Sequence, residues 1–486
     1  MRKLPFLILI ILIIQSLSAQ PIQLHPDNPH YLLYKGKPRV LITSAEHYGA
    51  VLNLDFDFKK YLQTLHDEGM DYTRIFTGSY VENSESFGIE KNTLAPLNDK
   101  VITPWARSNV PGYINGGNKF DLDKWNPDYF ARLHDFVATA EHLGIIVEVT
   151  FFSSIYRDDY WQYCPFYSEN NINNTDRIER IFVNTKRNGN LFNYQEAMVR
   201  KITRELNTYN NVIYEIQNEP WADQQGDVFL LNKTNIPKDQ QPWYTKSDLA
   251  SALSMEWQSA IAAIIRDEES KLPQKHLVAQ NYCNYGQPIP EVDQNVNIMN
   301  FHYVWPEAVR WNYGYDRPIS FDESGFSQYE EATYRKQAWR FILAGGAIFN
   351  NLDYSFVAGH EDGSFEKNTS PGLGTKSLRK QFRFLKEFMA GLDFVHMNPA
   401  NHLVWHAPGF IYQGMAKEGD QYAYYFEGTG DIEVQLQVKA GKYNVEWWDP
   451  ATGQKINSEP VKSKSSLLNI KGPEVTEDIA LKILAN

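Results

Sequence analysis

Cysteine is almost absent from this chain, because only Cys164 and Cys283 occur in 486 residues. Two cysteines are too few for a disulfide scaffold, although sequence alone leaves open whether they form one bridge. Neither cysteine belongs to a CxxC motif, and no HExxH motif occurs. The common patterns of zinc ligands are therefore missing, and we expect neither a metal nor a cofactor.

An excess of positive charge is also missing. The formal net charge is −12 at pH 7. Nucleic acids and anionic membranes both attract positively charged proteins, so neither is expected as a partner. Aromatic side chains, in contrast, make up 14% of the residues. Most of them are explained by a large core, but aromatic rings also suit the stacking of neutral ring-shaped ligands.

Long hydrophobic runs are limited to the N-terminus. Arg2 and Lys3 precede an apolar stretch over residues 4–14, and small residues follow up to Ala19. This stretch is too short to span a bilayer, so residues 1–19 are predicted to be a cleaved signal peptide, with an uncleaved anchor as the alternative. Cleavage would change the net charge from −12 to −14, because Arg2 and Lys3 leave with it. We expect a secreted or periplasmic protein without a membrane span in its mature form.

Residues 20–396 show strand and helix patterns in alternation. Helices are expected at 58–68, 127–143, 194–206, 247–266, 329–343 and 378–389. Eight strands are expected at 39–43, 72–77, 145–151, 212–216, 276–280, 297–301, 318–321 and 347–352. Such alternation is typical of βα units and a parallel sheet, and the count of eight favours a closed (β/α)8 TIM barrel over an open doubly wound sheet.

The pattern changes in residues 397–486. Short alternating strands are expected at 402–405, 410–413, 421–426, 432–436 and 443–447, with turn residues between them. This pattern predicts a small antiparallel β-sandwich domain after the α/β barrel. The sandwich could bind carbohydrate or only pack against the barrel, and packing is favoured because no isolated aromatic platform is visible.

Two of the expected barrel strands stop at a glutamate. Residues 212–216 lead to Glu219, and residues 318–321 lead to Glu323. Catalytic groups of TIM barrels lie at the C-terminal ends of different strands. Two carboxyl groups facing each other in this position are what cleavage of a glycosidic bond requires. A structural carboxylate at each strand end is the alternative.

Asn218-Glu219-Pro220 at the fourth strand and Glu323 at the seventh resemble the retaining glycoside hydrolases of clan A, which include cellulases, mannanases and β-galactosidases. The resemblance implies that Glu219 is the acid/base and Glu323 the nucleophile. It also implies that Asn218 holds the sugar 2-hydroxyl group and that Arg74 hydrogen-bonds to the nucleophile. A salt bridge elsewhere in the barrel is the alternative for Arg74.

Four further residues are candidates for substrate binding. His302 and Tyr303 end the sixth strand, where members of the clan place groups that orient the nucleophile, although His302 could equally be a core histidine. His47 ends the first strand, and Trp221 follows Pro220. Two departures leave the family within the clan unassigned. Family 5 cellulases have His-x-Tyr at strand six, whereas His302 and Tyr303 are adjacent in this chain. They also have a Trp at strand eight, whereas residues 347–356 contain no Trp.

The expected function is that of a secreted retaining β-glycosidase acting on a β-linked poly- or oligosaccharide. A β-glucan is favoured, with β-galactoside or β-mannan close behind. One alternative is a non-catalytic carbohydrate-binding barrel. Another is a metal-dependent hydrolase that uses Asp322, His302 and His47. Long loops at 81–121, 153–191 and 221–246 build the expected catalytic face, and the sequence leaves open whether they form a cleft or a pocket. It also leaves the oligomeric state unknown.

Overall fold

A computed structural model describes residues 20–231, 237, 240–327 and 330–486 of the chain. The predicted signal peptide lies outside the described residues. Within these ranges, no helix combines the length and apolar character that crossing a membrane requires. Cys164 and Cys283 are both buried and do not form a disulfide.

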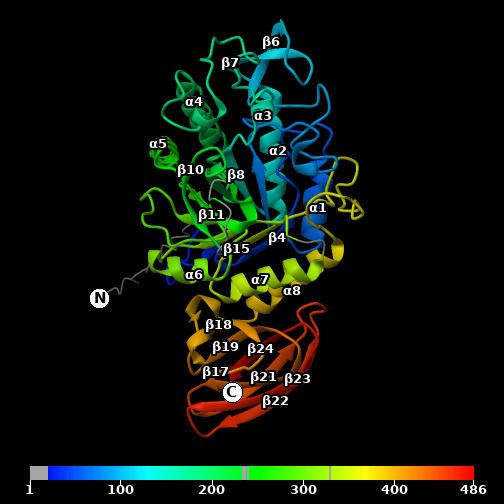
Figure 1. Cartoon of the computed structure of the whole chain (residues 1–486), viewed down its shortest axis with the longest axis vertical. Coiled ribbons are helices and arrows are strands. Elements are labelled where there is room, and N and C mark those ends of the chain that lie inside the picture. Colours follow the sequence, from blue (N-terminus) through cyan, green and yellow to red (C-terminus); the bar gives the residue numbers. More distant parts are fainter. Residues whose placement is uncertain (1–19, 232–236, 238–239, 328–329) are drawn as a thin grey trace, which may run out of the picture.

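Eight parallel strands form the barrel (Figure 1), which confirms the predicted (β/α)8 fold. Hydrogen-bonded pairing runs in the order β4, β15, β14, β13, β12, β9, β8, β5, and β4 and β5 lie against each other at the remaining seam. The strands are β4 (Leu41–Ala45), β5 (Tyr72–Phe76), β8 (Ile146–Ser153), β9 (Val212–Asn218), β12 (Leu277–Asn284), β13 (Ile298–His302), β14 (Ile319–Ser324) and β15 (Ile348–Leu352). All eight are buried along their whole length, as expected for a closed parallel sheet that helices surround.

Helices surround the barrel, and some of them begin at a side chain that caps the first turn. The Asp57 side chain accepts hydrogen bonds from the first turn of α1, and Asn126 caps α2, which has Pro127 as its first residue. The helices around the barrel are α1 (Phe58–Asp67), α2 (Pro127–Leu143), α4 (Leu191–Leu206), α5 (Ala252–Glu269), α6 (Glu307–Asn312), α7 (Glu331–Leu343) and α8 (Lys376–Ala390). A short helix, α3 (Asp158–Trp161), lies in the loop after β8.

Short strands extend the barrel at both of its ends. The sheet of β1 (Gln23–Leu24), β2 (Leu32–Tyr34) and β3 (Lys37–Arg39) lies at the base, where the Ile22 amide donates to the Asn210 carbonyl before β9. Two hairpins extend from the face at which the barrel strands have their C-terminal ends, β6 (Trp105–Pro111) with β7 (Asn118–Trp125) and β10 (Gln225–Leu230) with β11 (Lys246–Ala250).

The hairpin of β10 and β11 corrects one prediction. The helix expected from residue 247 begins at Ala252, and the residues before it form β11 instead. Ser251, rather than Ser247, caps the helix, because its hydroxyl accepts from the Ser254 amide. Both serines are plausible N-caps by residue type, and the pairing of Leu249 with Cys283 of β12 draws the preceding segment into the sheet.

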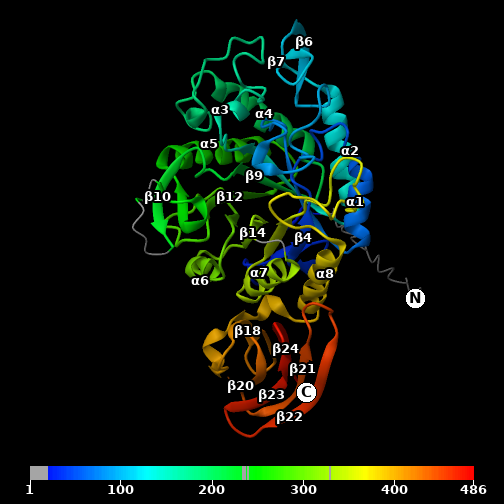
Figure 2. The same cartoon turned by 45° about the vertical axis from the view of Figure 1, so that its right-hand side comes forward.

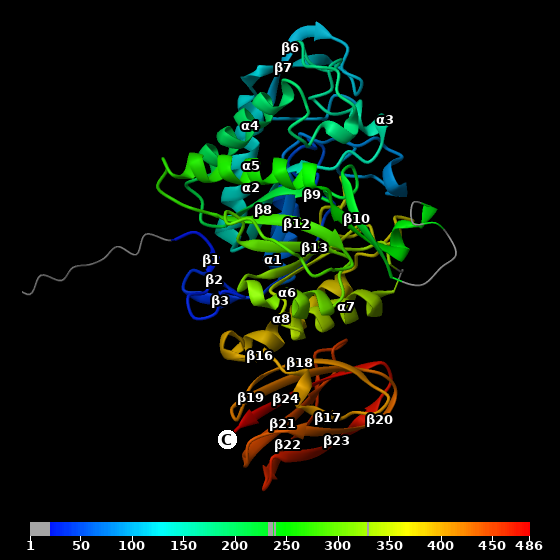
Figure 3. The same ribbon diagram turned by 60° about the vertical axis from the view of Figure 1, so that its left-hand side comes forward.

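The C-terminal strands form a sandwich, as predicted, and it lies beneath α7 and α8 (Figures 2 and 3). Stacking of Trp339 of α7 on Tyr425 of the sandwich, with ring centroids 5.5 Å apart, is one contact between the two parts. One sheet holds β16 (Asn398–Pro399), β18 (Ile411–Lys417), β19 (Gln421–Glu427), β24 (Asp478–Ala485), β21 (Gly441–Trp448) and β22 (Lys455–Ser463). The other holds β17 (Val404–His406), β20 (Gly430–Gln437) and β23 (Leu467–Val475).

Candidate active site

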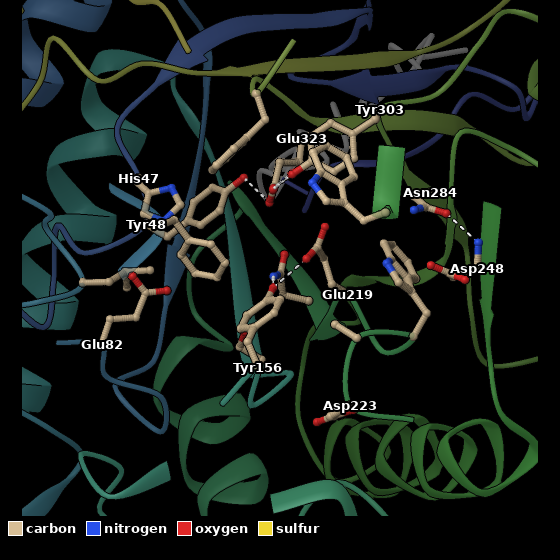
Figure 4. A pocket seen from close by; sticks show the side chains of 18 of the residues that line it. His47, Tyr48, Glu82, Tyr156, Glu219, Asp223, Asp248, Asn284, Tyr303 and Glu323 are labelled. Carbon is tan, nitrogen blue, oxygen red and sulfur yellow. Dashed lines mark hydrogen bonds between the residues drawn. The ribbon is translucent and has the colours of Figure 1, made fainter. Parts of the chain in front are cut away.

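A cavity of about 470 Å³ opens at the C-terminal ends of the barrel strands. Its size is within the range of small-molecule binding sites. Figure 4 shows side chains from several strand ends and loops converging on it. Of the eight residues predicted for the site, six line the cavity: His47, Asn218, Glu219, Trp221, Tyr303 and Glu323. The other two, Arg74 and His302, are fully buried next to these residues.

Glu219 follows the last residue of β9 and has a left-handed backbone with a φ of 47°. Such a conformation costs roughly 1–3 kcal/mol in a residue other than glycine, and it is concentrated at functional sites. The two carboxyl oxygens of Glu219 have different partners. Oε2 accepts a hydrogen bond from the Tyr156 hydroxyl at 2.7 Å, and Oε1 lies 2.9 Å from Nδ1 of His302. The side chain is therefore held in one orientation while it lines the cavity.

Glu323 lies in β14, and three groups hold its carboxyl group. The Tyr303 hydroxyl donates to Oε1 at 2.7 Å, and the Tyr48 hydroxyl donates to Oε2 at 3.1 Å. The Arg74 guanidinium group lies 3.5 Å from Oε2. The pKa of Glu323 lies above its ordinary value, because burial raises it most and Glu219 adds to this, although His302, Arg74 and the Tyr303 hydrogen bond lower it.

His302 contacts both glutamates. Its Nδ1 lies 3.5 Å from Oε2 of Glu323 in addition to the contact with Glu219, and its Nε2 lies 3.5 Å from Oδ2 of Asp322. Burial alone would lower the pKa of His302, but the Glu323 and Asp322 carboxylates raise it to about 10. A cationic imidazole at neutral pH then lies between the two glutamates. One ligand atom each from Glu219, His302 and Glu323 lies within 4.8 Å of the other two.

Arg74 of β5 has Glu215 as its closest partner. Its Nε donates to Glu215 at 2.8 Å, and its terminal nitrogens reach Asn218 at 2.8 Å and Asp322 at 3.4 Å. The contact with Glu323, at 3.5 Å, is longer. Arg74 thus takes part both in the predicted contact with Glu323 and in the alternative, a salt bridge deeper in the barrel. It also fixes the Asn218 side chain.

The remaining predicted residues, Trp221 and His47, both contact aromatic rings. The Trp221 ring meets the His302 ring edge to face, with centroids 5.4 Å apart, so Trp221 both lines the cavity and covers His302. The His47 ring lies between Tyr48 and Tyr354, with centroids 5.3 and 5.7 Å away. His47 Nδ1 is buried without a hydrogen-bond partner.

Several site residues were not predicted from the sequence. Tyr48 follows His47, at a strand end that the sequence does indicate, and Tyr156 lies in an aromatic-rich segment of the loop after β8. Both donate to the glutamates described above. Glu82 and Asp248 also line the cavity. Glu82 lies within a long loop and Asp248 within the hairpin mistaken for a helix, so no periodic pattern pointed to either residue.

Two clusters within the described residues have metal-ligating atoms close together. One is the trio of Glu219, His302 and Glu323, and neither cluster includes His47. The grouping of Asp322, His302 and His47 that a metal-dependent hydrolase would need is therefore not formed there.

The other cluster, Glu148, Glu215 and Asp322, is buried inside the barrel. Nδ2 of Asn300 lies 2.7, 3.1 and 3.0 Å from carboxyl oxygens of these three residues, and Arg74 adds its cation. Protein donors thus already contact the oxygens that would have to bind a metal ion. The cluster is better described as a network of hydrogen bonds beneath the cavity.

No family model matches the sequence, and no curated protein matches it. Solved structures do match. A candidate glycoside hydrolase of Bacteroides vulgatus has a TM-score of 0.65 at 11% identity, over 97% of this chain and 83% of that chain. A family 5 glycoside hydrolase of the same species has a TM-score of 0.56 at 12% identity, over 96% of this chain and 93% of the other. The chain therefore has the fold of glycoside hydrolases, in agreement with the resemblance to clan A, and no specific family is assigned.

Proposed function

We propose that this protein is an exported, retaining β-glycoside hydrolase with Glu323 as nucleophile and Glu219 as acid/base. The observation that carries the proposal is the closeness of the two carboxyl groups, because one oxygen of Glu219 and one of Glu323 lie within 4.8 Å of each other at the ends of different strands of the TIM barrel. Retaining glycosidases hold their carboxyl groups about 5–5.5 Å apart, whereas inverting enzymes need a wider gap for a water molecule.

In the first step, the Glu323 carboxylate attacks the anomeric carbon of the sugar while Glu219 donates its proton to the glycosidic oxygen. The bond between the anomeric carbon and that oxygen breaks, and the sugar becomes an ester of Glu323. In the second step, Glu219 takes a proton from a water molecule whose oxygen attacks the anomeric carbon. The ester bond breaks, Glu323 regains its charge, and the anomeric configuration is that of the substrate.

The surrounding residues support these roles. Tyr48, Tyr303 and Arg74 hold the Glu323 oxygens, so the nucleophile is oriented before substrate binds. Because the His302 cation contacts both carboxyl groups, it can stabilise whichever of them carries negative charge as the reaction proceeds. Asn218 lines the cavity beside Glu219, where it can hold a sugar hydroxyl group.

For the substrate we propose a β-linked poly- or oligosaccharide, with a β-glucan favoured over a β-galactoside or β-mannan. Trp221, Trp243 and Tyr303 give the cavity an aromatic lining, which suits sugar rings. The acidic net charge also fits a neutral substrate better than an anionic one.

The test is a screen of the purified protein on aryl β-glycosides and on β-glucan, mannan, xylan and galactan. Glu219→Ala and Glu323→Ala are assayed beside it, with Glu291→Ala, in an exposed loop, as the matched control. We expect Glu219→Ala to lose about 10²–10⁴-fold in rate, as is typical for removal of a general acid. We expect azide to rescue Glu323→Ala and to give a glycosyl azide of inverted configuration.

Other outcomes distinguish the alternatives. If wild type cleaves a substrate but azide yields no inverted product from Glu323→Ala, Glu323 is not the nucleophile. If the panel is inert while its sugars still bind, the non-catalytic carbohydrate-binding barrel replaces the proposal. Equal losses of activity in Glu291→Ala would point to general destabilisation.

A further inference from the structure

The cavity has two ends, with the proposed catalytic carboxyl groups between them. Figure 4 shows His47 and Glu82 on one side of Glu219 and Glu323, and Asp248 on the opposite side. Electrostatic effects agree with this placement. Burial, together with Glu323, raises the pKa of Glu82 to about 7, whereas burial, together with Glu219, raises the pKa of Asp248. The Tyr48 ring stacks on His47 and its hydroxyl donates to Glu323, so the first end adjoins Glu323, whereas Figure 4 shows Asp248 on the side of Glu219.

The proposed mechanism assigns a part of the substrate to each end. Glu323 must reach the anomeric carbon, so the sugar that forms the ester occupies the end with Glu82 and His47. Glu219 must reach the glycosidic oxygen, so the departing part of the substrate extends toward Asp248.

Three loops that are joined by hydrogen bonds border the end that adjoins Glu323. The loop after β5 is tied to the loop after β15, because the Thr369 amide donates to the Glu90 carboxyl group at 2.6 Å and the Glu90 amide donates to the Ser370 hydroxyl at 3.0 Å. The loop after β14 joins them, because the Phe326 amide donates to the Pro371 carbonyl at 2.9 Å. In the barrel, β4 lies between β15 and β5, so these loops together pass over the end of β4.

Aromatic rings of these loops pack against one another and on His47. Phe87 of the loop after β5 meets Phe326 edge to face, with ring centroids 6.2 Å apart. Phe326 in turn packs on Tyr354, which packs on His47, at 6.1 and 5.7 Å. Phe87 and Phe326 both have left-handed backbones, with φ of 55° and 54°. Residues other than glycine keep this conformation only where surrounding contacts hold them.

The end that adjoins Glu323 contains two polar groups suited to sugar hydroxyls. The Glu82 carboxyl group is 2% exposed and accepts from the Tyr80 hydroxyl at 3.0 Å and the Asn92 amide at 2.5 Å, which fixes it at the cavity wall. His47 is 8% exposed, lines the same end, and has an Nδ1 without a partner. Because Nδ1 itself is closed off from the cavity, the exposed part of the His47 ring is what a ligand hydroxyl group can contact.

We propose that the three loops close the end that adjoins Glu323 and that this end binds one terminal sugar, with Glu82 and His47 hydrogen-bonding to hydroxyl groups at the non-reducing end of the substrate, so that the enzyme releases single sugars from the end of a chain. This inference rests on the proposed glycosidase function. A substrate cut internally would need room for further sugars beyond Glu82, where the joined loops stand. The second end remains available to departing chains of any length.

The products of the wild-type enzyme test the inference directly. Cellohexaose, mannohexaose, xylohexaose and galactohexaose, each labelled at the reducing end, are digested and sampled early. We expect the labelled product to be one sugar shorter than the substrate, and we expect no cleavage after the non-reducing end has been blocked by a cyclic acetal. Labelled products several sugars shorter at the earliest times, or cleavage of the blocked substrate, would overturn the inference and leave the glycosidase proposal standing. Absence of any cleavage, here and on the polysaccharide panel, would overturn both.

Glu82→Gln tests the assigned polar contact, because it keeps the shape of the side chain and removes its charge. We expect kcat/KM on the cleaved oligosaccharide to fall roughly 10- to 100-fold, as for the loss of a hydrogen bond to a charged group. Glu85→Gln, an exposed acid in the same loop, is the matched control and should retain wild-type kcat/KM. Equal activity of Glu82→Gln and wild type would contradict the role of Glu82. Should Glu82→Gln not fold, the same comparison is made with His47→Gln, while the product test needs no variant.

Discussion

His302 is the residue through which the charges of the site can be tested by pH. It faces Glu219, Asp322 and Glu323, and these carboxylates hold its charge although it is fully buried. Its pKa in the folded protein is about 10, compared with 6.5 for an ordinary histidine. Because the folded pKa is the higher one, the charge of His302 stabilises the fold fully below about pH 6.5, and this contribution is lost as the pH rises toward 10.

The prediction concerns the difference in unfolding free energy between wild type and His302→Gln. We expect this difference to be at its full size at and below about pH 6.5 and to shrink as the pH approaches 10, as measured by urea denaturation at several pH values. His142→Gln, exposed on α2, is the control, and its effect should stay within about 0.5 kcal/mol at each pH. A difference for His302→Gln that is constant or grows with pH would mean that His302 is not held as a cation.

The sequence was sufficient to predict some residues of the site but not others. Glu219 and Glu323 follow buried strands, and the C-terminal ends of barrel strands converge by geometry alone. Tyr156 and Glu82 complete the site from long loops, whose path depends on tertiary contacts such as the hydrogen bond between the Glu82 carboxyl group and Asn92. Residue type and spacing do not specify such contacts, so these residues became visible only in the structure.

At the scale of elements, helix ends were well predicted wherever a cap and a breaker occur together. Asn126 and Gly144 bound α2 as expected from their residue types. The start of α5 was misplaced because the preceding segment pairs with β10 and β12, and neither partner is close in sequence to the predicted helix start. Capping and breaking residues therefore predicted the ends of helices whose flanking segments pair with no strand. They failed at α5, where the preceding segment pairs with strands of the sheet.

Gly144 provides a test of the helix end. It has a left-handed backbone with a φ of 77°, and a Cβ atom at this position would meet no other atom within 4 Å. Gly144→Ala should therefore destabilise the fold only through its backbone, by about 1–2 kcal/mol in urea denaturation. Gly314 is equally open but lacks a positive φ, so Gly314→Ala should not destabilise the fold in this way. Equal effects of the two substitutions would show that the backbone at Gly144 does not require glycine.

At the scale of the whole molecule, the barrel and the sandwich are joined by charged as well as aromatic groups. Arg335 of α7 is 4% exposed and makes two hydrogen bonds with Asp478 of β24, at 2.9 and 3.0 Å. A third hydrogen bond, at 2.8 Å, links Arg335 to Glu477. Because the Asp478 side chain is also only 4% exposed, each charge depends on the other for compensation. The interface should therefore make the two parts unfold together.

Arg335→Ala tests this coupling. The substitution leaves the Asp478 carboxylate buried without its cation, which typically costs about 3–5 kcal/mol. We expect calorimetry to show one unfolding transition for wild type and two for Arg335→Ala, with the sandwich separating from the barrel. Arg383→Ala, which removes an exposed ion pair with Glu387 on α8, should cost at most about 1 kcal/mol and keep one transition.

Replacement of both charged partners distinguishes a loss of coupling from a general loss of packing. In Arg335→Met combined with Asp478→Leu, no uncompensated charge remains at the interface, and buried ion pairs exchanged for apolar side chains are often neutral or stabilising. We therefore expect the double variant to regain a single transition. If it unfolds in two steps like Arg335→Ala, the geometry of the ion pair itself, rather than the compensation of charge, holds the sandwich on α7. If Arg335→Ala already unfolds as wild type does, the aromatic contact of Trp339 with Tyr425 is sufficient to couple the two parts.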